Sequence, residues 1–300
     1  MPKNAANATR NWLTAPMSDA LYTPLGQPGS GRQRYGAAMT LHRAGKLSDA
    51  ALEAYRIASA LDAQDPEELL RTVGAKRPVL PDPTPSALVQ SLVDEVDRYL
   101  QTLPGPGIAE VRSGLNGVRS APVTPPPGPE NPIVDQHLPP ALTALQKTHP
   151  SLAQAIAAAA PQLHWHSYDS YPITEIGAAF ATGHAFASLI GEGAPIAAND
   201  FDLGLFLIAP NLLYRDHHHP APELYAPLTG PHGWRFGPGR PLTIKPAHAP
   251  VWNPPNRPHL TKTGPTPFLC IFAWTADVNE PSHVIPADDW DALETITIKA

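Results

Sequence analysis

Cysteine is almost absent from this sequence of 300 residues, in which Cys270 is the single example. An intrachain disulfide is therefore excluded, and the reducing cytoplasm is the expected location. Cys270 stands in the apolar run PFLCIFAW, which predicts a buried strand residue. The sequence also lacks any apolar run of about 18 residues and any basic segment leading into an apolar one at its start. Neither a membrane span nor a signal peptide is predicted.

Charged residues are scarce, at 16% of the chain, and the formal net charge is -6. This balance provides no general attraction to nucleic acid or to an anionic membrane, so we expect neither as a partner. A small molecule is the expected partner instead. Two catalytic motifs are also missing, the glycine-rich phosphate loop and the Gly-x-Ser-x-Gly elbow, so nucleotide hydrolysis and serine esterase chemistry have no support.

Proline is abundant, with 39 residues, and its distribution divides the chain. Residues 1–30 have no sustained period and are predicted to be a flexible tail. Residues 31–104 form a predicted helical extension, with a helical pair capped by Ser48 or Asp49 and a further helix from Pro85 to Leu100. Residues 105–140 include APVTPPPGPENP and are predicted to be a linker. Residues 141–300 then form the main domain.

Short segments rich in aromatic and β-branched residues follow Leu163, and glycine, proline and asparagine punctuate them. Many short strands at close spacing favour a sandwich or a barrel. One helix is expected before them, from about Pro140 to Ala160, and another among them, from about Ile176 to Ile190. The predicted fold class is therefore mainly β with an α-helical amino-terminal extension.

The densest group of metal-ligand side chains lies in YRDHHHPAPELYAPLTG, residues 214–230. Side chains alternate along a strand, so His217 and His219 point to one face and His218 points to the other. Glu223 is an even number of residues from His217 and His219, so the same alternation places it with them. His259 is a fourth candidate ligand. Such a nitrogen and oxygen set suits one divalent transition metal, Fe, Mn, Ni, Co or Zn. The alternative is a histidine-rich turn that is simply exposed to solvent.

The spacing of these residues resembles the two sequence motifs of the cupins, which are double-stranded β-helix barrels. The first motif is matched by His217-x-His219, three residues, Glu223, six residues and Gly230. The second normally reads Pro-x-Gly, two residues and His, and Pro254-x-Asn256, two residues and His259 resembles it. Asparagine replaces the glycine, and it can also adopt left-handed conformations. The resemblance implies a cupin barrel over residues 163 to 285.

A longer string resembles the cupin-type dimethylsulfoniopropionate lyases. It comprises GLFLIAPNLLY, which ends at Tyr214, then His219, Glu223 and Tyr225, and later Trp274 in FAWTAD. In that family, histidines and a glutamate of the first motif and the histidine of the second hold the metal. The resemblance therefore implies a ligand set, which is His217, His219, Glu223 and His259. Those lyases are generally shorter, so the resemblance does not extend to residues 1–140.

The implied reaction is a metal-dependent β-elimination that cleaves dimethylsulfoniopropionate to dimethyl sulfide and acrylate. Tyr225 is the predicted base, because its strand parity places it with the ligands, and Tyr214 is the predicted second tyrosine or substrate positioner. The substrate is a sulfonium carboxylate, whose cation has no hydrogen-bond donor, so aromatic faces should receive it. The candidates for this contact are Trp274, then Trp252, Tyr168 and Tyr171.

Two other interpretations remain open. One is a cupin metalloenzyme that performs isomerisation or dioxygen chemistry on another small carboxylate. The other is a non-catalytic cupin that binds a ligand while its helical extension binds a protein. The sequence also leaves the identity of the metal and the oligomeric state open, with a homodimer among the arrangements.

Overall fold

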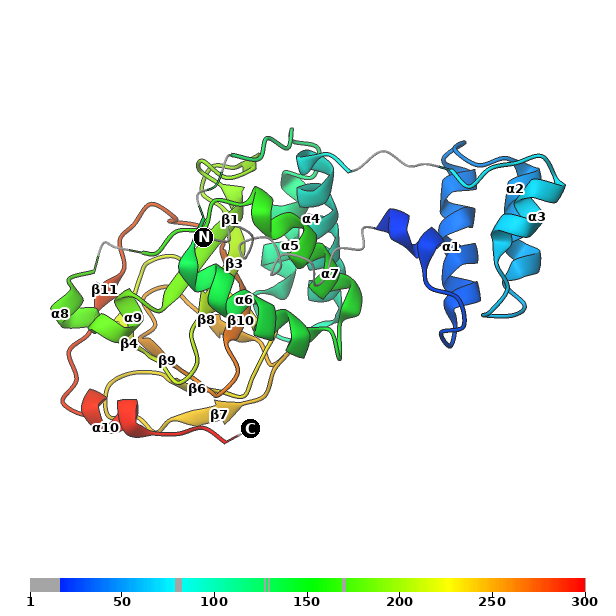
Figure 1. Ribbon diagram of the computed structural model, residues 1–300. Coiled ribbons are helices and arrows are strands. Elements are labelled where there is room, and N and C mark those ends of the chain that lie inside the picture. Colours follow the sequence, from blue (N-terminus) through cyan, green and yellow to red (C-terminus); the bar gives the residue numbers. More distant parts are fainter. Residues whose placement is uncertain (1–16, 79–82, 127, 129, 169–170, 300) are drawn as a thin grey trace, which may run out of the picture. The chain divides into compact units, whose positions relative to one another are not determined.

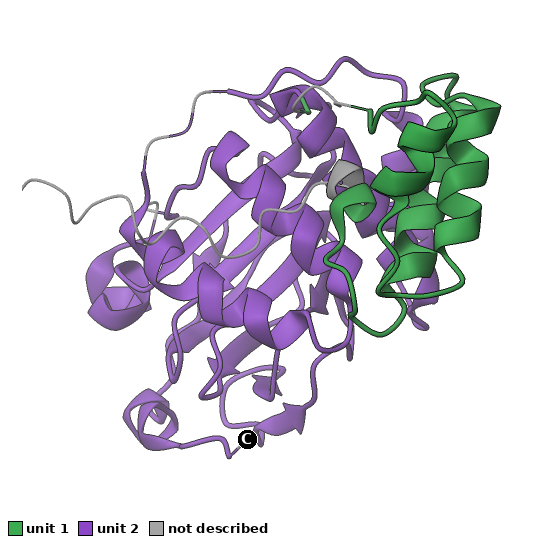
Figure 2. Cartoon of the chain, turned by 45° about the vertical axis from the view of Figure 1, so that its right-hand side comes forward, with its two compact units in different colours: residues 1–83 green, residues 84–300 purple. Residues whose placement is uncertain are grey.

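The computed structural model describes residues 17–78, 83–126, 128, 130–168 and 171–299. The chain forms two compact units, residues 1–83 and residues 84–300, which are drawn in different colours in Figure 2. The expected tail, residues 1–30, lies mostly outside the described residues. The boundary at residue 83 falls inside the stretch that the sequence indicated as one helical extension.

The first unit is a small helical bundle whose core includes Tyr55 and Leu70, both buried. Two of its helices, α2 and α3, begin at side-chain caps. The Ser48 hydroxyl accepts a hydrogen bond from the Ala51 amide (3.3 Å), and the Asp65 carboxylate accepts one from the Glu67 amide (2.9 Å). The expected helical pair is confirmed, and Ser48 is the cap. The elements are η1 (Met17–Tyr22), α1 (Ser30–Arg43), α2 (Asp49–Ala58) and α3 (Pro66–Thr72).

The second unit begins with helices that cover one sheet (Figure 1). The helix α6 contacts three strands, β1, β3 and β10, while α4 and α7 pack together. The expected helix from Pro85 to Leu100 is confirmed as α4. The helices of this unit are α4 (Pro85–Thr102), α5 (Ile108–Gly117), α6 (Pro132–Leu145), α7 (Pro150–Ala159), η2 (Ala160–Gln162), α8 (Ile173–Ile176), α9 (Ala178–Ala181) and α10 (Trp290–Thr295).

Prolines in this region begin helices as well as interrupt them. Pro132 occupies the first turn of α6 and Pro150 the first turn of α7, where a missing amide proton costs nothing. The single helix expected from Pro140 to Ala160 is therefore wrong, because the chain breaks before Pro150 into α6 and α7. The stretch 105–140 also contains α5 and part of α6, which its proline content alone did not indicate.

The strands form two sheets, of six and five strands, with orders β2-β1-β3-β10-β5-β8 and β11-β4-β9-β6-β7. From β3 to β5 and again from β8 to β10, successive strands alternate between the two sheets, as a double-stranded β-helix requires. The mainly β cupin domain with a helical amino-terminal extension is thereby confirmed. The strands are β1 (His184–Gly191), β2 (Ile196–Ala197), β3 (Asp202–Ile208), β4 (Leu213–His218), β5 (Glu223–Pro227), β6 (His232–Arg235), β7 (Thr243–Lys245), β8 (Val251–Asn253), β9 (His259–Thr263), β10 (Phe268–Trp274) and β11 (His283–Val284).

The helix expected from Ile176 to Ile190 is wrong. Two single-turn helices, α8 and α9, are followed by the strand β1, which pairs with β3 from His184 to Ile190. The alanines of this segment favour a helix locally, but pairing with a buried strand outweighs that local preference. Cys270 behaves as predicted, since it is a free, fully buried residue of β10. The described helices include none with the length and apolar character needed to cross a bilayer.

A buried ion pair joins the barrel to its carboxy-terminal segment. Arg235 donates to both carboxylate oxygens of Asp216, and neither side chain is exposed. Arg235 also donates to Asp289 (2.6 Å), and the Trp290 indole donates to Asp216 (2.8 Å). These contacts hold the start of α10 against β4 and β6.

We expect Arg235→Met to lower the free energy of unfolding by about 3 to 5 kcal/mol, because it leaves the buried Asp216 carboxylate without its charge partner. Urea denaturation, followed by circular dichroism, measures this change. Arg240→Met is the matched control, since Arg240 is exposed and its side chain has no such contact among the described residues. Equal stability of the two variants would contradict the expectation.

Candidate functional site

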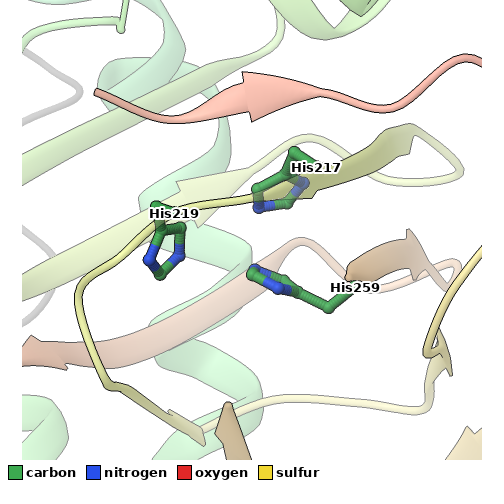
Figure 3. Close-up of side chains that lie close together, drawn as sticks. All are labelled: His217, His219 and His259. Atoms are coloured by element: carbon green, nitrogen blue, oxygen red, sulfur yellow. The ribbon is translucent and has the colours of Figure 1, made fainter. Parts of the chain in front are cut away.

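Three histidines converge inside the barrel (Figure 3). His217 lies on β4, His219 directly follows that strand, and His259 begins β9. His217 and His259 are directly paired across the two strands, and all three side chains are buried. One ring nitrogen from each lies within 4.8 Å of the others. His218 is not in this group, because its side chain is on the opposite face, 3.4 Å from Asn256 Oδ1.

Backbone carbonyls orient all three imidazole rings. The Nδ1 atoms of His217, His219 and His259 lie 2.8, 2.9 and 2.9 Å from the carbonyl oxygens of Arg215, Ala221 and Arg257. A carbonyl oxygen only accepts, so each Nδ1 carries a proton and each Nε2 is the ring nitrogen left to face the centre. Among the described residues, the buried Nε2 atoms of His217 and His259 have no hydrogen-bond partner. Such orientation of the second ring nitrogen is typical of histidines that ligate a metal.

Glu223 places a carboxylate at the same point. Its Oε2 lies 3.2 Å from His219 Nε2 and 3.3 Å from His259 Nε2. Burial by itself would raise the pKa of this carboxyl, but His219 and His259 hold the pKa well below its usual range. Burial and then His259 lower the pKa of His217 well below its usual value. The centre therefore combines the neutral imidazole of His217 with an ionised Glu223 carboxylate.

The loop of the second motif is joined to the first motif by its asparagine. Asn256 has φ 59°, which is the left-handed conformation expected for the residue that replaces glycine. In this conformation the Asn256 amide donates a hydrogen bond to the His219 carbonyl (2.8 Å). Gly230, at the end of the first motif, is required by close packing and not by its backbone conformation. A Cβ at this position would lie 2.5 Å from the Ala247 amide nitrogen.

A cavity of about 210 Å³ opens beside this centre and is lined mainly by aromatic side chains. Five of the residues predicted to act on the substrate line it, together with the Glu223 carboxylate. Those five are Tyr168, Tyr171, Tyr214, Tyr225 and Trp274. The structure thus brings most of the predicted residues to one place.

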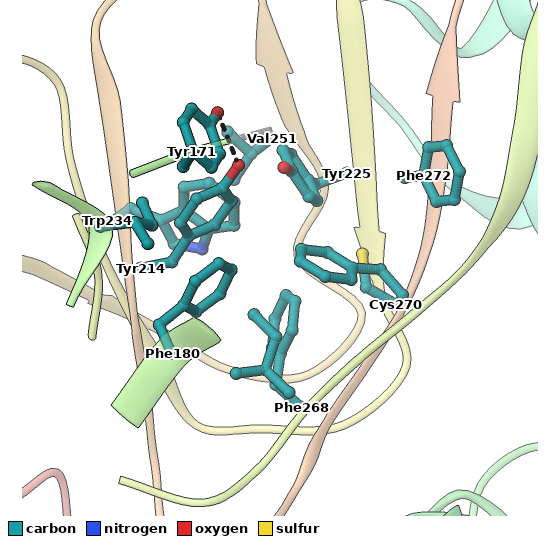
Figure 4. Packing of buried hydrophobic residues seen from close by; sticks show 12 residues of the cluster. Tyr171, Phe180, Tyr214, Tyr225, Trp234, Val251, Phe268, Cys270 and Phe272 are labelled. Atoms are coloured by element: carbon teal, nitrogen blue, oxygen red, sulfur yellow. Dashed lines mark hydrogen bonds between the residues drawn. The ribbon is translucent and has the colours of Figure 1, made fainter. Parts of the chain in front are cut away.

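Tyr214 reaches the cavity because β4 contains a bulge. The register against β9 shifts between Tyr214, opposite Thr261, and His217, opposite His259, so β4 has one extra residue. Simple alternation would place Tyr214 and His217 on opposite faces. Instead their rings stack, with centroids 3.9 Å apart. The Tyr214 hydroxyl also hydrogen-bonds to the Tyr171 hydroxyl (3.2 Å; Figure 4).

Tyr225 lies two residues beyond Glu223 on β5, and both side chains point into the barrel. Its ring centroid is 6.1 Å from that of His259. Burial and then the Glu223 carboxylate raise the pKa of Tyr225 well above its usual value. Burial and then Tyr171 do the same for the pKa of Tyr214. Both phenols are therefore protonated in the protein alone.

Trp274 contacts the centre directly. Its indole nitrogen donates a hydrogen bond to Glu223 Oε1 (2.8 Å), and its ring stacks on His219 with centroids 4.5 Å apart. Trp252 is the one predicted aromatic residue that the structure does not bring to the cavity. Val251 and Asn253 of β8 point inward, so strand alternation turns Trp252 outward, where it packs against Gly107.

Sequence reasoning missed two cavity residues, Asp202 and Phe272, which the sheet register aligns with predicted ones. Asp202, Trp274, Glu223 and Asn253 form one row of directly opposed residues across β3, β10, β5 and β8. Gly204, Phe272, Tyr225 and Val251 form the next row that points inward. Asp202 could have been noticed in the sequence, because it is an acidic residue at the start of the apolar strand DLGLFLI. The residues opposite it could not be identified without knowing which strand pairs with β3.

Parts of this chain are similar to known protein families and structures. Residues 119–270 match the family model for dimethylsulfoniopropionate lyase. The dimethylsulfoniopropionate lyase DddQ of Ruegeria pomeroyi is 30% identical over 155 residues, covering 49% of this chain and 75% of that protein. A putative dimethylsulfoniopropionate lyase, DddL, of Cereibacter sphaeroides is 29% identical over 138 residues, covering 43% of this chain and 54% of that protein.

Solved structures agree at the level of the fold. One chain from the crystal structures of the dimethylsulfoniopropionate lyases RdDddP and RnDddQII superimposes with a TM-score of 0.51 at 18% identity. The superposition covers 68% of this chain and 100% of the neighbour's chain. The rest of this chain has no counterpart in that neighbour.

Proposed function

Because this chain belongs to the dimethylsulfoniopropionate lyase family, whose members are carbon–sulfur lyases, we propose that it cleaves dimethylsulfoniopropionate to dimethyl sulfide and acrylate in a metal-dependent β-elimination. The observation that carries the proposal is the arrangement of the cavity. Three oriented histidines are grouped around the Glu223 carboxylate, and Glu223 lines the cavity together with Tyr225.

The residues present fit a divalent transition metal. Two buried Nε2 atoms without a partner among the described residues, a third imidazole and the ionised Glu223 form a mixed donor set, with every Nδ1 already bonded to a carbonyl. His217, His219, Glu223 and His259 would hold the ion. When bound, the ion would offset the negative charge that develops on the substrate carboxylate and favour the phenolate form of a nearby tyrosine.

The rest of the cavity suits the sulfonium end of the substrate. That cation has two methyl groups and no hydrogen-bond donor, so it is bound by aromatic faces better than by hydrogen-bond acceptors alone. Tyr168 and Tyr171 lie with ring centroids 4.7 Å apart at the cavity wall. With the substrate carboxylate at the histidines, these rings are available to the sulfonium.

In the proposed reaction, Tyr225 acts as its phenolate, which a bound ion would favour, and this oxygen accepts the proton from the carbon next to the substrate carboxylate. The electron pair of that carbon–hydrogen bond forms the double bond of acrylate, and the carbon–sulfur pair leaves with neutral dimethyl sulfide. Tyr225 holds the proton at its phenol oxygen, and burial excludes competing water from that atom. Tyr214 and Tyr171, joined by their hydroxyl groups, position the substrate beside it.

The direct test is to incubate the full chain, loaded separately with Fe(II), Mn(II), Ni(II), Co(II) or Zn(II), with dimethylsulfoniopropionate. Headspace gas chromatography measures dimethyl sulfide, and acrylate should appear in equal amount. No release with any of these metals would remove the lyase proposal for this substrate. Oxygen consumption that depends on Fe(II) and another carboxylate would instead support dioxygen chemistry in the same barrel.

Trp274→Phe is expected to weaken metal binding by about 10- to 100-fold, because it keeps an aromatic ring but removes the donor to Glu223 Oε1. Competition with a chromophoric chelator measures the affinity without any need for turnover. Trp252→Phe is the matched control, since Trp252 lies outside the cavity. Unchanged affinity in Trp274→Phe would limit Trp274 to contact with the substrate.

A further inference from the structure

Asp202 is an acidic residue of the cavity wall that has no part in the proposed metal centre. It is the first residue of β3, and it lines the same cavity as Tyr225 and Trp274. Its directly opposed partner is Trp274, whose own partner on the other side is Glu223. Asp202 and Glu223 are therefore two carboxylates in one row, with the Trp274 indole between them.

The surroundings of Asp202 do not neutralise it. Within the described part of the chain, no lysine, arginine or histidine forms an ion pair with this carboxylate, and its Oδ1 has no hydrogen-bond partner. Burial raises the pKa of Asp202 to about 6, although a hydrogen bond with Ser188 lowers it. At neutral pH the carboxylate is thus mostly ionised. A partly buried anion without a counter-charge is costly unless a ligand provides one.

We propose that Asp202 is the specificity-determining counter-charge for the sulfonium end of the substrate, an inference that rests on the proposed function. The cavity would then recognise a zwitterion by two opposite charges. The histidine centre binds the carboxylate end, and Asp202 with the aromatic side chains binds the cationic end.

The spacing of the row supports this assignment. Asp202 and Glu223 are two strands apart, which corresponds to about 9 to 10 Å between their backbones. A carboxylate and a sulfonium separated by two methylene groups fit along such a span when one end lies at the histidines. Trp274 stands between the two carboxylates in the register, and it lines the cavity that they share.

The charge of the substrate changes during the reaction, and this determines the kinetic effect of Asp202. The sulfonium is cationic in the bound substrate, but the departing dimethyl sulfide is neutral. Attraction to Asp202 is therefore strongest before the carbon–sulfur bond breaks and fades as it breaks. Such an interaction lowers KM and does not raise kcat. Asp202 is thus a binding and specificity residue.

The test compares the sulfonium substrate with 4-methylpentanoate, in which a neutral CH group replaces the sulfur cation. In Asp202→Asn we expect KM for dimethylsulfoniopropionate to rise roughly 10- to 100-fold, with kcat unchanged or higher. The inhibition constant of 4-methylpentanoate should stay the same or fall, because that compound has no cation for Asp202 to attract. If Asp202 had a purely structural role, the substitution would weaken the binding of both compounds together. That result would overturn the assignment.

Asp200→Asn is the matched control, since Asp200 lies two residues away, is exposed and does not line the cavity. Asparagine also tolerates its positive φ of 53°. This control should retain the wild-type preference for the cation. If the wild-type chain released no dimethyl sulfide, the proposed function would fail, and calorimetric binding of the two compounds would still measure the preference. Absence of any preference for the sulfonium over 4-methylpentanoate in wild-type protein overturns the role of Asp202 in either case.

Discussion

Tyr225→Phe is expected to lose turnover by at least about 10²-fold, and up to about 10⁴-fold, while the protein keeps its metal. The substitution removes only the phenol oxygen that accepts the proton in the proposed reaction. The ring remains in the inward row with Gly204 and Phe272, so the packing of the wall is preserved. Dimethyl sulfide release measures the first effect, and metal analysis after dialysis measures the second.

The control for this variant is the loss of a buried hydroxyl elsewhere in the same unit. Tyr99→Phe removes a hydroxyl that hydrogen-bonds His248 Nδ1 (3.0 Å) and does not line the cavity. It should leave activity unchanged. Full activity in Tyr225→Phe would contradict the assigned base and transfer the role to Tyr214, whose hydroxyl lies in the same cavity.

His259→Ala is expected to lose metal and activity together. Partners that only orient a ligand contribute about 10- to 100-fold to metal affinity, so removal of a ligand itself should exceed about 100-fold. His259 is also the one proposed ligand from β9, and its loss would leave all the others on the single segment from His217 to Glu223. Metal content after dialysis, with chelator competition for the residual affinity, measures the effect.

His218→Ala is the matched control, because it removes the histidine adjacent to His217 in the same cluster. Its side chain lies on the opposite face and is excluded from the group of converging nitrogens. Metal content and turnover should therefore match those of the wild-type chain. Loss of metal from His218→Ala as severe as from His259→Ala would contradict the proposed ligand set, and circular dichroism would show whether either variant is unfolded.

The local pattern was enough to predict much of the centre. The two-residue period of a strand separates His217 and His219 from His218, and it places Glu223 with Tyr225. The left-handed conformation of Asn256 also followed from the chemistry of that residue. These predictions succeeded because each depends on the covalent geometry of a few neighbouring residues.

Patterns failed where a contact with a distant strand decided the outcome. Alanines between Ile176 and Ile190 favoured a helix, yet pairing with β3 makes part of the segment a strand. Trp252 was a reasonable aromatic candidate, but the register of β8 turns it away from the cavity. Neither result can be derived from nearby residues, because both depend on which strand lies alongside.

The sequence by itself determined which histidines share a strand face, because side chains alternate along a strand. The resemblance of its motifs to those of the cupins also indicated the barrel. Only the tertiary structure decided which residues surround the centre. A bulge in β4 turns Tyr214 onto the face of His217, and sheet register aligns Asp202, Trp274 and Glu223 in one row. The physical reason is that register and bulges arise from hydrogen bonds between strands far apart in the chain.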